Sequence, residues 1–213
     1  MKRSNRLPLD TLRSYLLELP FVTEQPPSPW RWVDIFGNER PVEVEVGFGK
    51  GLFLTRAAAA CPDVNFLGID ISRKYQLLAA GRLHQQQLSN VRLLKADARG
   101  VLRCLVPEDS VQAVHVYFPD PWWKKRHWKR RVFTEEFARS CARVLRPGGQ
   151  LHVATDVSDY FAIIQETVSS QTELRPLPPS QATDPQHDLD YLTHFERKFR
   201  IAGRPIYRAC YVK

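Results

Sequence analysis

The chain has 213 residues, enough for one well-buried domain and too few for two of ordinary size. Its hydrophobic content of 43% excludes global disorder. Lysine and arginine number 31 against 23 aspartate and glutamate residues, and the resulting formal charge of +8 favours an acidic partner, either nucleic acid or an anionic membrane surface.

Residues 1–29 are predicted to be a lead-in to a single domain that spans residues 30–213. Within the lead-in, the spacing of four apolar residues predicts a short amphipathic helix: Leu12, Tyr15, Leu16 and Leu19. Residues 24–29 are rich in proline and predict a connector. Apolar anchors follow, including Trp30 and Trp32, which we expect to pack the lead-in against the domain.

The remaining pattern alternates strands with helices. Strands are predicted at residues 42–46, 65–70, 91–95, 111–118 and 150–155. Helices are predicted at residues 52–61, 73–88, 101–105, 133–145 and 158–169, with Arg146–Gly149 ending the fourth. A surface loop at residues 171–190 and an antiparallel strand pair at residues 193–200 and 206–212 complete the chain. This order predicts an α/β fold: a mostly parallel seven-stranded sheet with helices on both faces and a C-terminal antiparallel pair.

Acidic side chains lie in or just after the five alternating strands: Glu45, Asp70, Asp97, Asp120 and Asp156. Any one acid at such a place is more commonly a turn residue or a helix cap. Five at equivalent places predict an acidic rim along the edge of the sheet where the parallel strands end, because ligands of open α/β sheets bind there.

A glycine turn, Gly47-x-Gly49-x-Gly51, follows the first of these strands. It differs by one residue from the dinucleotide pattern G-x-G-x-x-G, and it lacks the Gly-Lys-Ser/Thr ending of a triphosphate-binding loop. Asp70 stands where an acid accepts the hydroxyls of a ribose. An acidic rim favours a cationic cofactor, so S-adenosylmethionine fits better than NAD.

The segment 117–131 places Asp120 between two prolines and follows it with three tryptophans, six cations and a histidine. Each proline fixes its own φ and biases the preceding residue to an extended conformation. Cations interleaved with aromatic rings are typical of a nucleic-acid surface. Since no basic amphipathic helix with a long apolar face accompanies them, we prefer nucleic acid to membrane. Trp122 is expected to pack in the core, whereas Trp128 is open to either core packing or RNA stacking.

The chain resembles the bacterial tRNA (guanine-N7-)-methyltransferases, a group of class I S-adenosylmethionine-dependent enzymes, over about Ile35 to Val212. Four motifs carry the resemblance: Glu45–Gly51 (EVGFGKG); Phe118–Trp122 (FPDPW) with Lys124–His127 and Lys129–Arg131; Ala154–Asp156; and Thr193–Glu196 (THFE) with Gly203–Ile206. At four positions the chain departs from the common pattern of the family: Asp70, Trp123, Trp128 and His194.

The resemblance implies transfer of a methyl group from S-adenosylmethionine to N7 of a guanine in the variable loop of tRNA. The cofactor contacts that it implies are Glu45, Gly47, Gly49, Gly51, Asp70, Asp97 and Asp120, and Asp120 is also the implied catalytic residue. The implied guanosine contacts are Lys124, Asp156, Thr193, His194, Phe195 and Glu196. The implied tRNA contacts are Arg126, His127, Trp128, Lys129, Arg130 and Arg131.

Other functions remain open. A different S-adenosylmethionine-dependent methyltransferase, acting on nucleic acid or on a small molecule, would share the acidic rim, and a non-catalytic RNA-binding module would share the cations. Asp156 and Glu196 are rivals of Asp120 for orienting the guanine. The sequence has no metal-ligand pattern, no signal-peptide pattern, no apolar run that could span a bilayer and no C-x-x-C pair, so we expect a cytoplasmic protein with reduced cysteines and no metal.

Overall fold

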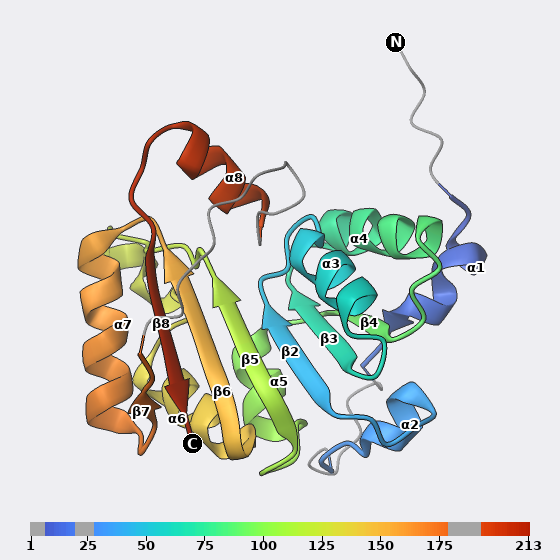
Figure 1. Cartoon of the computed structure of the whole chain (residues 1–213), viewed down its shortest axis with the longest axis horizontal. Helices are drawn as coiled ribbons and strands as arrows, with labels where there is room; N and C mark the ends of the chain where they lie inside the picture. The colour runs from blue at the N-terminus through green and yellow to red at the C-terminus, as the bar shows by residue number, and fades with distance from the viewer. Residues whose placement is uncertain (1–6, 20–27, 179–192) are drawn as a thin grey trace.

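The computed structural model describes residues 7–19, 28–178 and 193–213, and these form one mixed sheet of eight strands (Figure 1). The strands run across the sheet in the order β1 (Leu16–Leu17), β4 (Val91–Lys95), β3 (Asn65–Asp70), β2 (Val42–Val46), β5 (Val111–Tyr117), β6 (Leu145–Thr155), β8 (Tyr207–Val212) and β7 (Arg175–Pro176). The first six are parallel, and β8 is antiparallel to both of its neighbours. The predicted α/β class with a C-terminal antiparallel pair is confirmed.

Helices lie on both faces of the sheet, with α3 and α4 on one face and α5, α6 and α7 on the other (Figure 1). The main helices are α3 (Leu52–Ala60), α4 (Arg73–Gln85), α5 (Ala98–Cys104), α6 (Glu135–Val144), α7 (Ser158–Gln171) and α8 (His194–Ile201). The shorter helical segments are α1 (Leu9–Leu12), η1 (Arg13–Tyr15), α2 (Trp32–Phe36) and η2 (Lys125–Arg130).

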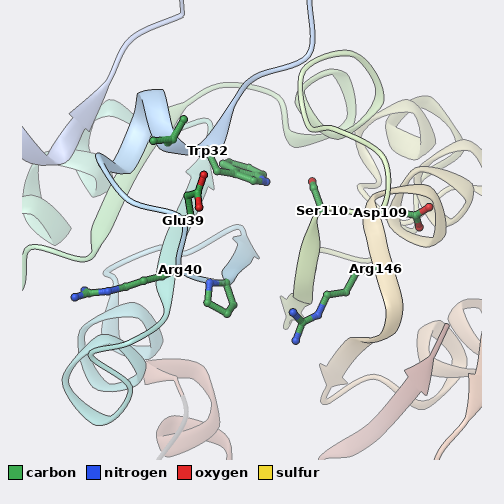
Figure 2. A pocket seen from close by; sticks show the side chains of 8 residues that line it. Trp32, Glu39, Arg40, Asp109, Ser110 and Arg146 are labelled. Carbon is green, nitrogen blue, oxygen red and sulfur yellow. The ribbon is translucent and has the colours of Figure 1, made fainter.

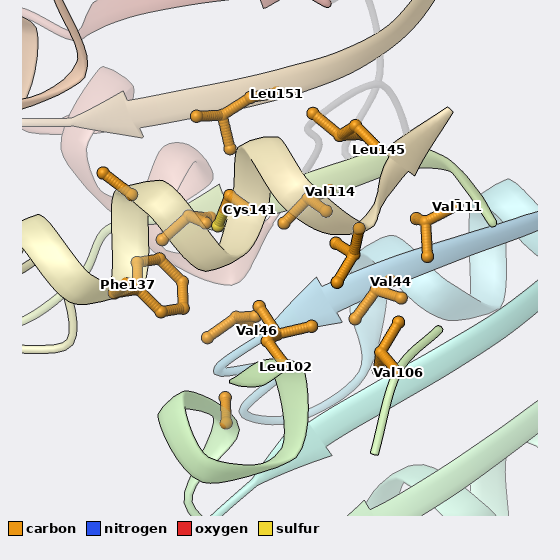
Figure 3. Packing of buried hydrophobic residues seen from close by; sticks show 14 of the residues in the cluster. Val44, Val46, Leu102, Val106, Val111, Val114, Phe137, Cys141, Leu145 and Leu151 are labelled. Carbon is orange, nitrogen blue, oxygen red and sulfur yellow. The ribbon is translucent and has the colours of Figure 1, made fainter. Parts of the chain in front are cut away.

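The larger core fills the space between the sheet and the α5–α6 layer (Figure 3). Strand β2 alternates, so Val44 and Val46 point into this core while Glu43 and Glu45 take the opposite face. Leu102 of α5 and Phe137 of α6 close the core from the helix side, and each is almost fully buried. Burying one such side chain contributes roughly 1.5–3 kcal/mol, so this layer holds β2 and β5 rigidly beneath their carboxyl ends.

The segment before residue 30 differs from its prediction. The predicted amphipathic helix is limited to the single turns α1 and η1, after which Leu16–Leu17 pair in parallel with Leu93 and Leu94. The open edge of β4 explains the change, because its unpaired backbone groups accept a strand. Most of the predicted connector lies outside the described residues. The domain boundary at residue 29 stays a prediction.

The prediction of a strand at residues 193–200 is wrong, because this segment is helix α8. Thr193 caps the helix by accepting a hydrogen bond from the Glu196 backbone N–H at 3.0 Å, and Glu196 pairs with Arg200 one turn later. The partner of β8 is instead β7, which lies within the predicted loop 171–190. The part of that loop from residue 179 lies outside the described residues.

The chain order reverses between β2 and β5. From β2 the chain proceeds outward through β3 and β4 and then crosses back to β5 on the other side. This is the topological switch point, where ligands of open α/β sheets bind beyond the carboxyl ends of the strands. Figure 1 shows α8 lying beyond the same edge.

Candidate functional site

The glycine turn after β2 is held close to α4 and β3. Gly51 has φ 72°, and a Cβ at this position would lie 2.6 Å from Cβ of Ala79, so only glycine fits. The Gly49 backbone N–H donates to Oδ2 of Asp70 at 2.9 Å. Two predicted cofactor contacts, the turn and the acid after β3, are therefore joined directly.

Glu45 is the most deeply buried of the five acids, with 3% of its surface exposed. Its Oε2 atom is buried without a hydrogen-bond partner in the described structure. Burial, with the nearby charge of Asp70, raises the pKa of the Glu45 carboxyl well above its usual value. A buried, unpartnered carboxylate at a ligand edge fits a cationic group of a ligand, such as the ammonium of S-adenosylmethionine.

Asp70 retains acceptor capacity for a ligand. Besides Gly49, it accepts a hydrogen bond from the Ser72 backbone N–H at 2.8 Å, and a carboxylate has about four acceptor sites. The two backbone donors fix the orientation of the carboxylate, and its remaining lone pairs suit the hydroxyls of a ribose.

Asp97 has the structural role of a helix cap, which is common for an acid that follows a strand, and it also has a partner that the sequence does not reveal. It caps α5 and forms an ion pair with Arg99, whose Nη2 lies 2.6 Å from Oδ2, and this hydrogen bond lowers the pKa of the Asp97 carboxyl. Arg99 also donates to the backbone carbonyl of Lys129 at 2.8 Å. Arg99 thus links the acidic rim to the cationic segment, a role that no local sequence pattern indicates.

Asp120 is exposed just beyond the end of β5, between two residues in strained conformations. Phe118 has φ 52° and Trp122 has φ 43°, in the left-handed region that favours glycine. The extended conformation predicted for Phe118, which precedes Pro119, is therefore wrong. Its N–H donates to the Ala154 carbonyl at 2.7 Å and its ring packs 5.5 Å from that of Phe199, so sheet pairing and packing hold the strained backbone.

The cationic segment folds as the 3-10 helix η2 and packs against the predicted aromatic residues. The guanidinium of Arg130 lies 5.1 Å from the ring of Trp122, and that of Arg131 lies 5.5 Å from the ring of Trp123. Arg131 also donates to the Pro121 carbonyl at 2.6 Å, which ties the segment to the loop of Asp120. Lys124, Arg126, Lys129 and Arg130 are exposed, and His127 is half-buried. The side chain of Trp128 lies outside the described structure.

The two rivals of Asp120 are both engaged by arginines. The Glu196 side chain is 5% exposed and is paired with Arg200 at 3.1 Å and with Arg208 of β8. Asp156 follows β6 and accepts a hydrogen bond from Nη1 of Arg204 at 2.9 Å. The backbones of His194 and Phe195 lie in the first turn of α8, and their side chains are not described.

Sequence reasoning missed a buried polar network beneath this edge. Its centre is His115 of β5, which is hydrogen-bonded to Glu43 and to the hydroxyl of Tyr117, both at 2.9 Å, and stacks 4.9 Å from His152. Burial raises the pKa of Tyr117 and lowers that of His152 to about 4. Polar residues at alternate positions of adjacent strands were the available signal.

A cavity of about 420 Å³ lies at the opposite edge of the sheet, near the starts of β2 and β5. Figure 2 shows Trp32, Glu39 and Arg40 on one side of it and Asp109, Ser110 and Arg146 on the other. None of the predicted site residues lines it. Among the described residues, no cluster of His, Cys, Asp or Glu is placed to hold a metal ion, and within the same ranges no helix is long and apolar enough to cross a membrane.

The strand order, the glycine turn after β2 and the acids at the switch point define a class I S-adenosylmethionine-dependent methyltransferase fold. Two solved methyltransferases share it. The 16S rRNA methyltransferase KamB has a TM-score of 0.57 at 18% identity, over 84% of this chain and 90% of that chain. The phosphoethanolamine N-methyltransferase 2 of Haemonchus contortus, solved in complex with S-adenosyl-L-methionine, has a TM-score of 0.54 at 14% identity, over 87% and 53%.

Sequence comparison gives the family. Residues 39–209 match a family described as putative methyltransferase. The tRNA (guanine-N(7)-)-methyltransferase of Rhodopirellula baltica is 46% identical over 186 residues, which cover 84% of this chain and 68% of that protein. The chain belongs to the tRNA (guanine-N(7)-)-methyltransferase family, and its cofactor is S-adenosylmethionine.

Proposed function

We propose that this protein transfers a methyl group from S-adenosylmethionine to N7 of a guanine in the variable loop of tRNA. The observation that carries the proposal is the position of Asp120, an exposed carboxylate at the switch point between the glycine turn and the cationic segment η2. The name of the Rhodopirellula baltica relative supports the same reaction.

The chemistry requires no general base. S-adenosylmethionine supplies an electrophilic methyl group, and guanine N7 carries a lone pair and no proton. The protein therefore contributes by positioning the purine and excluding water. The rigid β2–β5 pair beneath the site suits this role, since positioning depends on a scaffold that does not move.

Three acids would hold the cofactor. Glu45, with its unpartnered buried oxygen, compensates positive charge at the methionine end. Asp70 accepts from the ribose hydroxyls while Gly49 and Ser72 hold its carboxylate in place. Asp97 contacts the adenine side of the cofactor, and its ion pair with Arg99 fixes the orientation of its carboxylate.

Asp120 orients the guanine by accepting hydrogen bonds from N1–H and the N2 amino group. As N7 is alkylated, the purine becomes positively charged and N1–H becomes more acidic. A hydrogen bond from this edge to a carboxylate then strengthens in the transition state, which is where binding accelerates a reaction. Lys124, Asp156 and the segment 193–196 surround the nucleoside, and residues 126–131 meet the tRNA backbone.

The test is incubation of the purified protein with labelled S-adenosylmethionine and unmodified tRNA, followed by mapping of N7-methylguanosine. Asp120→Asn should lower kcat about 100-fold or more, because one electrostatic contact to the transition state is lost. Asp63→Asn is the matched control, since Asp63 is an exposed acid in the loop between α3 and β3. Absence of label in every tRNA, with cofactor bound, would refute the function, whereas an undiminished rate for Asp120→Asn would refute only the role of that residue.

A further inference from the structure

The three acids that the proposed function places near the guanine differ in how firmly the protein engages them. Asp120 is exposed. The Glu196 side chain is buried and joins two elements, since its partners Arg200 and Arg208 belong to α8 and β8. Asp156 is intermediate: its side chain is only 13% exposed, while that of its partner Arg204 is 58% exposed.

The Arg204 side chain offers Asp156 the same kind of hydrogen-bond donors as the substrate guanine does. A guanidinium offers adjacent N–H donors in one plane, as the N1–H and N2 edge of guanine does, and both groups match a carboxylate. We propose that Arg204 occupies the guanine-binding position of Asp156 in the free protein, and that the target guanine displaces it. This inference rests on the proposed function, since it assigns Asp156 to the same base.

The surroundings of Asp156 explain why its carboxylate needs a hydrogen-bonded partner when no guanine is bound. A carboxylate with so little solvent contact is destabilising unless a hydrogen-bonded partner compensates it. Arg204 supplies that partner when the site is empty. A guanine edge that takes its place keeps the carboxylate hydrogen-bonded, so the exchange leaves no buried acceptor without a donor.

Arg204 is also placed to leave without disturbing the fold. Its backbone N–H donates to the Phe199 carbonyl at 2.9 Å, and this bond does not depend on the side chain. Its guanidinium lies 5.3 Å from the Phe199 ring, over which it can remain after it releases Asp156. Arg208 has no such freedom, because its side chain is only 28% exposed and is bound to the buried Glu196.

Competition of this kind lowers the apparent affinity for the substrate by the fraction of molecules in which Asp156 is free. An ion pair with one largely exposed partner is weak. Its strength corresponds to an apparent affinity for tRNA that is about two- to sixfold lower than it would be without the pair. Arg204→Ala should therefore bind unmodified tRNA about two- to sixfold more tightly than the wild-type protein does.

The experiment compares dissociation constants for two transcripts that differ only at the target position, one with guanine and one with adenine. Adenine cannot offer the paired donors, so Arg204→Ala should tighten binding of the guanine transcript alone. Lys198→Ala is the matched control, because Lys198 is an exposed cation that lies 5.9 Å from the same Phe199 ring. It should leave the ratio of the two constants unchanged.

Two results would overturn the inference. Equal weakening of both transcripts by Arg204→Ala would make Arg204 a phosphate contact, and unchanged binding of both would make its ion pair purely structural. In the Asp156→Asn background the gain from Arg204→Ala should disappear, which tests the pair independently of catalysis. Thermal unfolding checks that each variant is folded, and Arg204→Gln serves if the alanine variant is not. If the wild-type protein methylates tRNA but Arg204→Ala brings no tightening, the inference fails while the proposed function stands.

Discussion

Two glutamates two residues apart on the same face of β2 have opposite electrostatic environments. Burial raises the pKa of Glu45, and the nearby Asp70 adds to this effect. Burial also acts to raise the pKa of Glu43, but hydrogen bonds from His115 and Gln112 outweigh it and the net pKa is lowered. Their neutral variants therefore have opposite expected effects on the ligand-free protein.

Glu45→Gln should stabilise the ligand-free protein at neutral pH. The native state retains the Glu45 proton above pH 4.5, where the unfolded chain has lost it, so the free energy of unfolding falls as pH rises from 4.5 towards the raised pKa. The amide removes this fall and should raise the free energy of unfolding at neutral pH. Denaturant unfolding as a function of pH measures it.

The same variant should weaken S-adenosylmethionine binding about tenfold or more, because a charge-assisted contact is lost, and calorimetry measures this. Glu43→Gln is the control of opposite sign. The stability that ionised Glu43 contributes is present above pH 4.5 and is lost as pH falls through its lowered pKa, so its amide should destabilise the protein at neutral pH. Unchanged stability and affinity in Glu45→Gln would contradict the role given to Glu45.

At the residue level, the sequence could predict which acids lie in or after the strands, but it could not predict their partners. The acids follow the strands, and the alternation of strands and helices fixes where parallel strands end. Arg204 lies 48 residues from Asp156, and the pair depends on where α8 docks. Glu196 likewise meets Arg208 only because α8 and β8 pack together. Tertiary packing of this kind leaves no local pattern in the sequence.

At the scale of elements, α8 carries predicted site residues and was predicted to be a strand. The four residues Thr193–Glu196 have the Ser/Thr-x-x-Glu pattern of a capping box, which is a helix-start signal. The helix is only eight residues long and follows residues that lack periodicity, so a strand was predicted here although the capping pattern was present.

Thr193→Ala should loosen α8 without unfolding the protein. The substitution removes the cap on the Glu196 N–H and should cost about 1 kcal/mol. Hydrogen exchange of the α8 amides should increase while that of β2 and β5 stays constant. Thr193→Ser retains the capping oxygen and should behave like the wild-type protein. Equal acceleration across the sheet and α8 would show that the cap supports the whole domain instead.

At the scale of the whole molecule, the formal charge of +8 favours binding to a polyanion, and η2 and its flanks carry part of that charge. Four exposed cations there, Lys124, Arg126, Lys129 and Arg130, can each meet a phosphate. The affinity for tRNA should then fall with salt concentration at a log–log slope of about −3 to −4.

Removing one of these charges, as in Lys124→Gln or Lys129→Gln, should reduce the magnitude of this slope by about 1. Arg31→Gln is the control, because Arg31 is an exposed cation that precedes α2, at the opposite edge of the sheet. Binding titrations at several salt concentrations measure the slope for each variant. If Arg31→Gln changes the slope as much as Lys124→Gln does, the tRNA does not bind preferentially at η2.

The number of strands was underestimated because the shortest strands have no period to detect. Strands β1 and β7 have two residues each, too few for alternation, and each exists because a longer neighbour offers its backbone. The longer strands β2, β3 and β4 were predicted at their observed bounds, because five or six residues suffice to show a β-rich run between turn signals.

These two short strands lie at the two edges of the sheet. An exposed edge of a sheet invites pairing with another chain, and a long flat edge is a starting point for aggregation. Here the outermost strand at each edge has only two residues, and at one of them Pro176 lacks a backbone N–H to donate. Short outermost strands of this kind are one of the ways in which proteins limit edge-to-edge association.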